Sequence, residues 1–194
     1  MSSATTRTTP RSHAPGAAET PSETPRPEPG RGPRTLDDLA YLEAPALADL
    51  YRRAGVPEPA DLIGDLRGRM LAVPGSESVP FLFDALRRFS ALPVFPWRGK
   101  SFLPGEGADR AEGVNRVISD RFRIYPFAAC IRPSRAGAFD AVELDYDRPE
   151  NPFFIRAIRD EVREVGPGLW LGQAYVRVLG RDRLVLYFGL ARAR

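Results

Sequence analysis

The segment PWRGKSF, residues 96–102, contains the only lysine in a chain of 194 residues. Every other basic side chain, apart from one histidine, is an arginine. Unlike a guanidinium, a buried ε-amine can lose its proton and form an imine with a carbonyl compound. Lys100 is therefore a candidate for Schiff-base chemistry or anion binding if its side chain points inward. The interpretation that we favour is simpler: an arginine-rich chain keeps one lysine, for no chemical reason, in a structural role or as a solvated surface amine.

The direction of the Lys100 side chain depends on the strand around it. Regular alternation in a strand places Lys100 on the same face as Phe102 and on the opposite face from Trp97. A glycine inside a strand often marks a bulge, and Gly99 lies between the two residues. A bulge at Gly99 would change which way Trp97 faces relative to the lysine.

A second group of reactive side chains lies in DYDRPENPFFIRAIRDEVREV, residues 145–165. We favour a solvated face with surface ion pairs, each worth about 0 to 1 kcal/mol. The alternative is a partly buried network of Asp145, Arg156 and Glu161 at a barrel mouth. There an arginine would hold a carboxylate ligand, and a buried carboxylate would move protons. Lys100, Asp145 and Glu161 are accordingly the candidate catalytic residues.

Histidine and cysteine chemistry is nearly absent from the sequence. His13 is the only histidine and Cys130 the only cysteine. His13 belongs to an N-terminal stretch that the composition predicts to be disordered, so it is a poor catalytic residue. These counts argue against Ser-His-Asp and Cys-His catalysis, a disulfide framework and histidine-ligated metals. We expect neither a metal ion nor a cofactor.

The composition divides the chain into a tail and one domain. Residues 1–34 contain seven of the twenty prolines and no Val, Ile, Leu or aromatic residue. Such a stretch buries too little apolar surface to fold, so we expect a disordered Pro/Ser/Thr-rich tail. Hydrophobic residues make up 43% of the whole chain. Residues 35–194 are therefore predicted to form a single globular domain.

The charge distribution bears on partners and location. The net charge is +3, and five arginines against three glutamates in residues 1–34 account for most of it. The remaining chain is close to neutral, so we expect no nucleic-acid partner. No apolar run approaches the about 18 to 20 residues of a membrane-spanning helix, and no secretory signal is evident. We expect a cytoplasmic protein without a transmembrane segment, and the sequence leaves its oligomeric state open.

Local signals predict three helical regions and a series of strands. Thr35 and Asp38 form a capping pattern for a helical pair around Pro45, and a second helix begins near Ser78 and ends near residue 92. A third, short helix follows Asn151, which is a suitable N-cap, and would carry Phe154, Ile155 and Ile158 on one face. Strands are expected at residues 66–73, 94–103, 114–119, 121–131, 139–146, 160–165, 169–179 and 183–191.

The last strand decides between sheet architectures. Residues 183–191 read RLVLYFGLA, which is apolar on both alternating faces and needs cover on both sides. A closed barrel supplies that cover if one face fills the barrel and the other lies under the N-terminal helices. We therefore predict a mainly β (α+β) fold, an antiparallel barrel of about eight strands with helices packed on it. An open, strongly curved sheet is the alternative.

Several motifs resemble those of an uncharacterised bacterial family: W-x-G-K-x-F, a later Asn-Arg, L-D-Y-x-x-x-x-N-P and D-E-x-R-x-x-x-P-G-L-x-L-G. In this chain they comprise Trp97, Gly99, Lys100, Phe102, Asn115, Arg116, Leu144, Asp145, Tyr146, Asn151, Pro152, Asp160, Glu161, Arg163, Pro167, Gly168, Leu169, Leu171 and Gly172. The likeness spans roughly residues 36–190 and implies no catalytic residue. The expected layout is also similar to the calycins, small barrels that hold lipophilic ligands, although no lipocalin signature motif is present.

Three classes of function follow from this fold. The first is binding of a small hydrophobic or amphipathic molecule in a barrel cavity. The second is a metal-free, histidine-free enzyme of isomerase, cyclase or lyase type, and the third is a protein-interaction domain. A cavity with an aromatic wall and an inward charge would favour the enzyme, a purely apolar cavity the carrier, and a filled core the interaction domain. The candidate ligand-binding residues are Trp97, Asn115, Tyr146, Arg156, Arg163, Trp170 and Tyr175.

Overall fold

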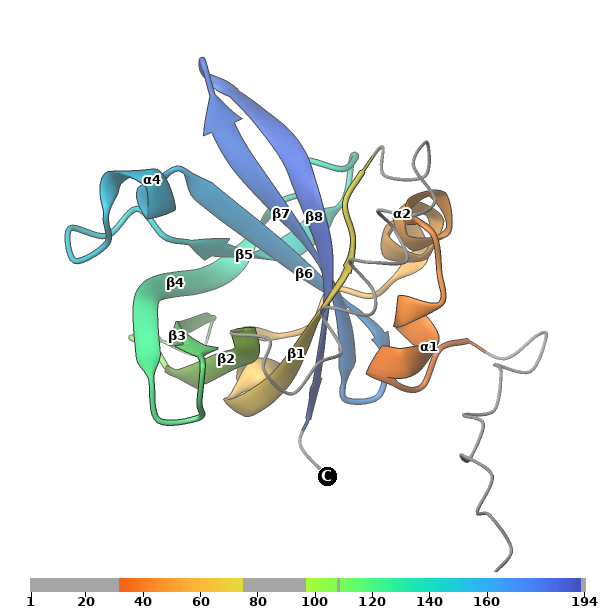
Figure 1. Cartoon of the computed structure of the whole chain (residues 1–194), viewed down its shortest axis with the longest axis horizontal. Coiled ribbons are helices and arrows are strands. Elements are labelled where there is room, and N and C mark those ends of the chain that lie inside the picture. The colour runs from red at the N-terminus through yellow and green to blue at the C-terminus, as the bar shows by residue number, and fades with distance from the viewer. Residues whose placement is uncertain (1–31, 75–96, 108, 193–194) are drawn as a thin grey trace, which may run out of the picture.

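Eight antiparallel strands form a closed barrel in the order β1 to β8 (Figure 1). The computed structural model describes residues 32–74, 97–107 and 109–192. Each strand pairs with its neighbours along the chain, and β8 returns to pair with β1. The mainly β barrel predicted from the sequence is confirmed, and closure leaves no free sheet edge in it.

All eight predicted strands are present, with ends that differ from the predictions by a few residues. They are β1 (Gly64–Ala72), β2 (Trp97–Pro104), β3 (Arg110–Val117), β4 (Arg123–Pro133), β5 (Asp140–Asp145), β6 (Ile158–Gly166), β7 (Leu169–Val178) and β8 (Arg181–Arg192).

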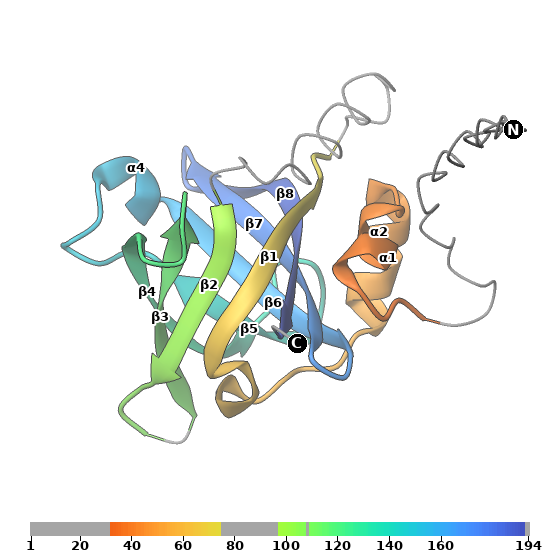
Figure 2. The ribbon, with the colours of Figure 1, turned by 60° about the horizontal axis from the view of Figure 1, so that its bottom comes forward.

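Short helices lie around the barrel. They are α1 (Leu36–Ala40), α2 (Ala44–Arg53), the 3-10 helix η1 (Pro59–Leu62) and α4 (Phe153–Arg156). Thr35 and Asp38 form the predicted capping box of α1. Both α1 and α2 lie against the outer wall of the barrel (Figure 2). The helix expected near residues 78–92 lies outside the described residues. No helix in the described part of the chain is long and apolar enough to cross a membrane.

The barrel wall separates two hydrophobic clusters, and β8 contributes to both. Phe188 and Leu190 belong to the inner cluster, together with Leu62 of η1. Tyr187, which directly precedes Phe188, belongs to the outer cluster under α1 and α2, which also contains Leu47. The double burial predicted for the last strand therefore arises from barrel side chains on one face and helices on the other.

The helix near residue 152 is shorter than predicted. Only one turn forms, with Pro152 rather than Asn151 at its N-cap. Asn151 is buried, and its side-chain amide donates hydrogen bonds of 2.8 Å to the carbonyl oxygens of Pro126 and Tyr146. Ile158, expected on the helix, begins β6 and pairs with β7. Long-range strand pairing thus ends this helix early.

Candidate ligand-binding cavity

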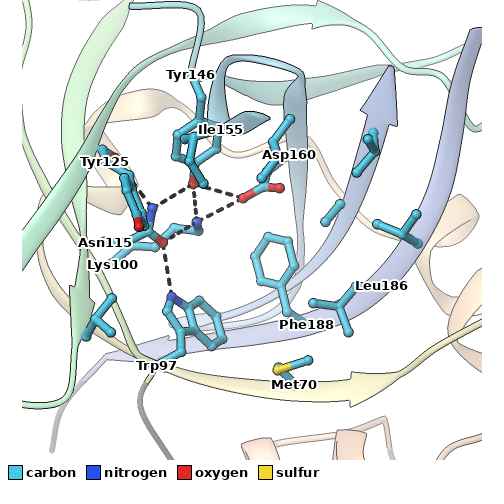
Figure 3. A pocket seen from close by; sticks show the side chains of 15 residues that line it. Met70, Trp97, Lys100, Asn115, Tyr125, Tyr146, Ile155, Asp160, Leu186 and Phe188 are labelled. Carbon is cyan, nitrogen blue, oxygen red and sulfur yellow. Dashed lines mark hydrogen bonds and ion pairs between the residues drawn. The ribbon is translucent and has the colours of Figure 1, made fainter. Parts of the chain in front are cut away.

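The barrel encloses a cavity of about 300 Å³ (Figure 3). Its walls are mostly apolar, and they come from seven of the strands and from α4. The lining residues are Met70, Trp97, Lys100, Asn115, Val117, Tyr125, Tyr146, Ile155, Ile158, Asp160, Ala174, Val176, Val185, Leu186 and Phe188. Most of the polar side chains gather on one wall (Figure 3). Apolar pockets of this size with a few convergent polar groups are typical small-molecule sites.

Lys100 points into this cavity, so the expectation of a solvated surface amine is wrong. Its side chain is only 2% exposed. Its Nζ donates to Asn115 Oδ1 at 3.0 Å, to the Tyr146 hydroxyl at 2.5 Å and to Asp160 Oδ2 at 2.9 Å. An ammonium group has three donors, and all three have partners here. The buried charge is therefore paired and fully hydrogen-bonded.

The partners of Lys100 also bind one another. The Tyr146 hydroxyl donates to Asp160 Oδ2 at 3.0 Å and accepts from Asn115 Nδ2 at 3.1 Å. Asn115 Oδ1 accepts a further hydrogen bond of 3.0 Å from Trp97 Nε1. We call these five residues the Lys100 cluster: Trp97, Lys100, Asn115, Tyr146 and Asp160. They come from four different strands or strand ends, so barrel closure is needed to assemble them.

Aromatic rings surround the amine. Lys100 Nζ lies 5.6 Å from the ring centroid of Trp97, 5.3 Å from those of Phe127 and Phe188, and 5.2 Å from that of Tyr146. Ring faces attract a cation at such distances, which offsets part of the cost of removing the ammonium from water.

Burial shifts the proton equilibria of the cluster in opposite senses. Burial lowers the pKa of Lys100, and the charge and hydrogen bond of Asp160 offset part of this fall. Burial raises the pKa of Tyr146 well above its usual value, and the negative charge of Asp160 raises it further. Lys100 therefore releases a proton more readily than a surface lysine does, whereas Tyr146 keeps its proton and remains a donor.

A bulge at Gly99 explains how Trp97 and Lys100 face the same cavity. The pairing of β2 with β3 shifts register between Trp97 and Gly99. Gly99 has φ of +130°, and a Cβ there would lie 2.1 Å from the carbonyl oxygen of Leu66. Only glycine fits this conformation and this close approach. The structure thus follows the bulged alternative, and the regular alternation expected for β2 does not hold.

Glu161 lies on the other side of the barrel wall from its neighbour Asp160. It is 1% exposed and belongs to a network beneath α2. Its carboxylate accepts from the Tyr51 hydroxyl at 3.2 Å, from Ser134 Oγ at 2.7 Å, and from Arg135 through its backbone N–H at 2.9 Å and its Nη1 at 2.8 Å. The contacts tie α2 and the turn after β4 to β6. Glu161 does not line the cavity.

The remaining charged candidates lie outside the cavity as well. Asp145 is 42% exposed and pairs with Arg159 at 3.1 Å, while the half-exposed Arg156 pairs with Asp147 at 2.7 Å. These are surface ion pairs, as in the simpler interpretation of residues 145–165. The mouth network of Asp145, Arg156 and Glu161 does not form, because the three side chains have separate partners.

Arg163 is also on the outer wall. Its guanidinium donates to the carbonyl oxygens of Asp140, at 2.5 Å, and Ala54, and lies 4.2 Å from the ring centroid of Phe139. Burial lowers its pKa. Arg163 holds the segment after α2 against the barrel and has no contact with the cavity.

The two candidate aromatic residues of β7 are part of the packing. Trp170 is 1% exposed and belongs to the inner cluster, away from the cavity lining. The Tyr175 hydroxyl donates to Gln173 Oε1 at 2.7 Å, and its ring lies 5.8 Å from the Arg135 guanidinium, within the outer network. Regular alternation along β7 turns Tyr175 outward, on the face of Leu171, while Ala174 lines the cavity.

The structure thus brings together Trp97, Lys100, Asn115 and Tyr146 among the predicted site residues. It adds Asp160, which sequence reasoning passed over in favour of Glu161. Alternation could have found it, because Asp160 shares its strand face with Val162, a core residue of the barrel interior. Tyr125 and Phe188 were missed because nothing local marks an aromatic residue as lining rather than filling a barrel.

No group of three or more His, Cys, Asp and Glu side chains in the described ranges is arranged to hold a metal ion. No protein-family model matches the chain, and no curated protein matches it. A protein of known crystal structure from Thermomonospora curvata is similar with a TM-score of 0.46 and 18% identity, over 79% of this chain and 89% of that one.

Proposed function

We propose that the protein binds one small, predominantly apolar molecule in the barrel cavity. The observation that carries this proposal is the cavity of about 300 Å³, whose walls are apolar except for the Lys100 cluster and Tyr125. A barrel whose interior only served stability would be filled by side chains. The apolar walls would hold the body of the ligand, and the Lys100 cluster would meet its polar group.

The charges of the site favour an uncharged ligand. The ammonium of Lys100 and the carboxylate of Asp160 balance each other at 2.9 Å. A carboxylate ligand would bring a second negative charge into a cavity whose only described cation is already paired. Burying such a charge without a partner is strongly unfavourable. We therefore expect alcohols, aldehydes, ketones or esters rather than acids.

Fluorescence titration with N-phenyl-1-naphthylamine, an uncharged probe of apolar sites, tests the proposal. We expect saturable binding of one probe per chain. Ala174→Phe fills the cavity from β7 and should weaken binding about tenfold or more, which corresponds to about 1.4 kcal/mol. Arg177→Phe, an exposed position on the same strand, is the matched control and should bind as the parent does.

Displacement of the same probe tests the charge argument. The alcohol 3-phenylpropan-1-ol should displace it at lower concentration than the anion 3-phenylpropanoate, which has the same carbon skeleton. Equal binding by the parent and Ala174→Phe would contradict the proposed site. Tighter binding of the anion would contradict only the expectation that the ligand is uncharged, and not the proposed site.

An enzyme is the second candidate function. The observation in its favour is that the cavity combines an aromatic wall with an inward amine, phenol and carboxylate in mutual hydrogen-bond contact. Such a set can move protons to and from a bound substrate without a metal or histidine. A carrier would release its ligand unchanged, whereas an enzyme would release a different molecule, and analysis of the released compound separates the two.

A further inference from the structure

We propose that Lys100 binds aldehyde or ketone ligands covalently, as a reversible imine at its Nζ. This inference rests on the proposed function, because the carbonyl compound must first enter the barrel cavity. It narrows the ligand class from uncharged apolar molecules to those with a carbonyl group. Three features carry it: the position of the amine, the groups that exchange protons with it, and the choice of lysine at this place.

The position of the amine suits attack on a bound ligand. Lys100 lines the cavity, and the surrounding side chains are aromatic or aliphatic over most of the wall. The carbonyl group of an apolar aldehyde or ketone would be directed to the polar wall, where Nζ lies (Figure 3). Lys100 is only 2% exposed, so water has little access to Nζ, which favours an imine over its hydrolysis.

The cluster can deprotonate the ammonium group of Lys100 without changing the net charge of the cavity. Transfer of one proton from Nζ to Asp160 along their 2.9 Å hydrogen bond converts an ammonium and a carboxylate into an amine and a carboxylic acid. Burial, which lowers the pKa of Lys100, acts in the same direction. Asp160 Oδ1 has no hydrogen-bond partner among the described residues, and Figure 3 shows it pointing away from Lys100. The transferred proton lies on Oδ2, and Oδ1 remains an open acceptor.

The reaction then balances within the site. The lone pair of Nζ attacks the carbonyl carbon, the C–N bond forms, and the carbonyl oxygen takes a proton from Asp160 to give a carbinolamine. The nitrogen next loses a proton to the Asp160 carboxylate. Asp160 returns a proton to the hydroxyl group, which leaves as water while the C=N bond forms, and the product is a protonated imine beside the Asp160 carboxylate. Tyr146, 2.5 Å from Nζ and 3.0 Å from Asp160 Oδ2, can relay these protons. No oxidant or reductant is consumed.

The choice of lysine fits this role better than a structural one. A guanidinium forms two parallel bonds to a carboxylate and suits a purely structural pair with Asp160. Of the 28 Lys and Arg residues in the chain, all except Lys100 are arginine. Arginine stays protonated in proteins and forms no imine in this way. The only lysine of the chain lies where an amine that can lose its proton faces a cavity.

Reductive trapping tests the inference, with 3-phenylpropanal as the probe and cyanoborohydride as the reductant. Peptide mapping by mass spectrometry then compares labelling at Lys100 with labelling at the α-amine of the chain. An ordinary lysine, with a pKa of about 10.4, would react more slowly at neutral pH than an α-amine of pKa about 8. We expect the reverse order, with one label per chain, mainly on Lys100.

Two variants distinguish ligand binding in the cavity from imine formation at Lys100. Ala174→Phe should reduce labelling at Lys100 about tenfold, in line with its loss of ligand affinity, and leave the α-amine unaffected. Lys100→Arg should lose the internal label entirely. Binding of 3-phenylpropan-1-ol without any Lys100 adduct from the aldehyde would overturn the imine and leave the proposed function standing. Absence of both binding and adduct would overturn the two together, and preferential labelling of the α-amine would overturn the imine.

Discussion

At the scale of single residues, the buried pair of Lys100 and Asp160 should dominate the energetics of the cavity. Lys100→Met keeps the length of the side chain but leaves the Asp160 carboxylate buried without its cation. Removing one partner of a buried ion pair costs about 3 to 5 kcal/mol. We expect a loss of this size in the free energy of unfolding, measured by urea denaturation.

The double variant Lys100→Met with Asp160→Leu is the control for this prediction. Replacing both charges by apolar groups removes the unpaired carboxylate, so it should recover most of the lost stability. If Lys100→Met alone is as stable as the parent, the carboxylate is not buried against the amine as described.

Buried tyrosines predict a loss of stability at alkaline pH. Burial raises the pKa of Tyr51, Tyr146 and Tyr175, and Glu161 or Asp160 adds to the shift. These phenols ionise near pH 10 in the unfolded chain and later in the folded one. Above about pH 10 the unfolded state therefore binds fewer protons, and each tyrosine lowers stability by up to about 1.4 kcal/mol per pH unit.

Lys100 contributes to the pH dependence of stability with the opposite sign. Its lowered pKa means that the unfolded chain holds the extra proton up to about pH 10.5, so this term increases stability as the pH rises to that value. The three tyrosines outweigh this one lysine as the pH approaches about 10, so the net decline should begin there. Urea unfolding between about pH 9 and pH 11.5 measures the slope, and Tyr146→Phe should make it shallower. An unchanged slope in that variant would contradict the buried phenol.

At the scale of elements, the bulge in β2 positions the site. Gly99 and Gly64 both have a positive φ, which alanine adopts poorly. A Cβ at Gly99 would also clash with the Leu66 carbonyl oxygen, whereas a Cβ at Gly64 would have no neighbour within 4 Å. The positive φ alone costs about 1 to 2 kcal/mol. We expect Gly99→Ala to cost about 1 to 3 kcal/mol more than Gly64→Ala, because the close approach must open. It should also weaken ligand binding, because Trp97 and Lys100 turn with the bulge.

Equal losses of stability in the two alanine variants, with ligand binding intact in both, would contradict this account of the bulge. Thermal or urea unfolding and the fluorescence titration supply the two readings on the same samples.

The outer network should matter for stability and not for binding. Glu161→Gln replaces a carboxylate that accepts four hydrogen bonds, one of them an ion pair with Arg135 at 2.8 Å. Hydrogen bonds to charged groups contribute about 1.5 to 3 kcal/mol each, and glutamine retains some of them. We expect a loss of about 2 to 3 kcal/mol with the affinity for the probe unchanged. A marked loss of affinity would place Glu161 in the site after all.

The elements were more predictable from sequence than the site. Strands and their turns are encoded locally, by alternation, Gly, Pro and Asp, so β1 to β8 were found. The faces of the strands depend on pairing between distant segments. The bulge at Gly99 turns Trp97 inward, and β6 begins at Ile158 where a helix was expected. Local pattern contains neither of these pairings, and the bulge decided that Trp97 faces the cavity.

At the scale of the whole molecule, the barrel wall divides two kinds of polar chemistry. In the outer network the Glu161 carboxylate accepts four hydrogen bonds from protein groups. The inner Lys100 cluster borders a cavity, and Asp160 Oδ1 has no hydrogen-bond partner in the described part of the chain. The domain boundary after residue 34 remains a prediction.

The central claim is that this cavity holds an uncharged apolar molecule. Native mass spectrometry of the protein purified from the cells that make it tests the claim most directly. We predict a species that carries one small molecule per chain, which denaturation releases for identification and which Ala174→Phe does not carry. The bare chain alone, or an adduct that Ala174→Phe carries equally, would contradict the account.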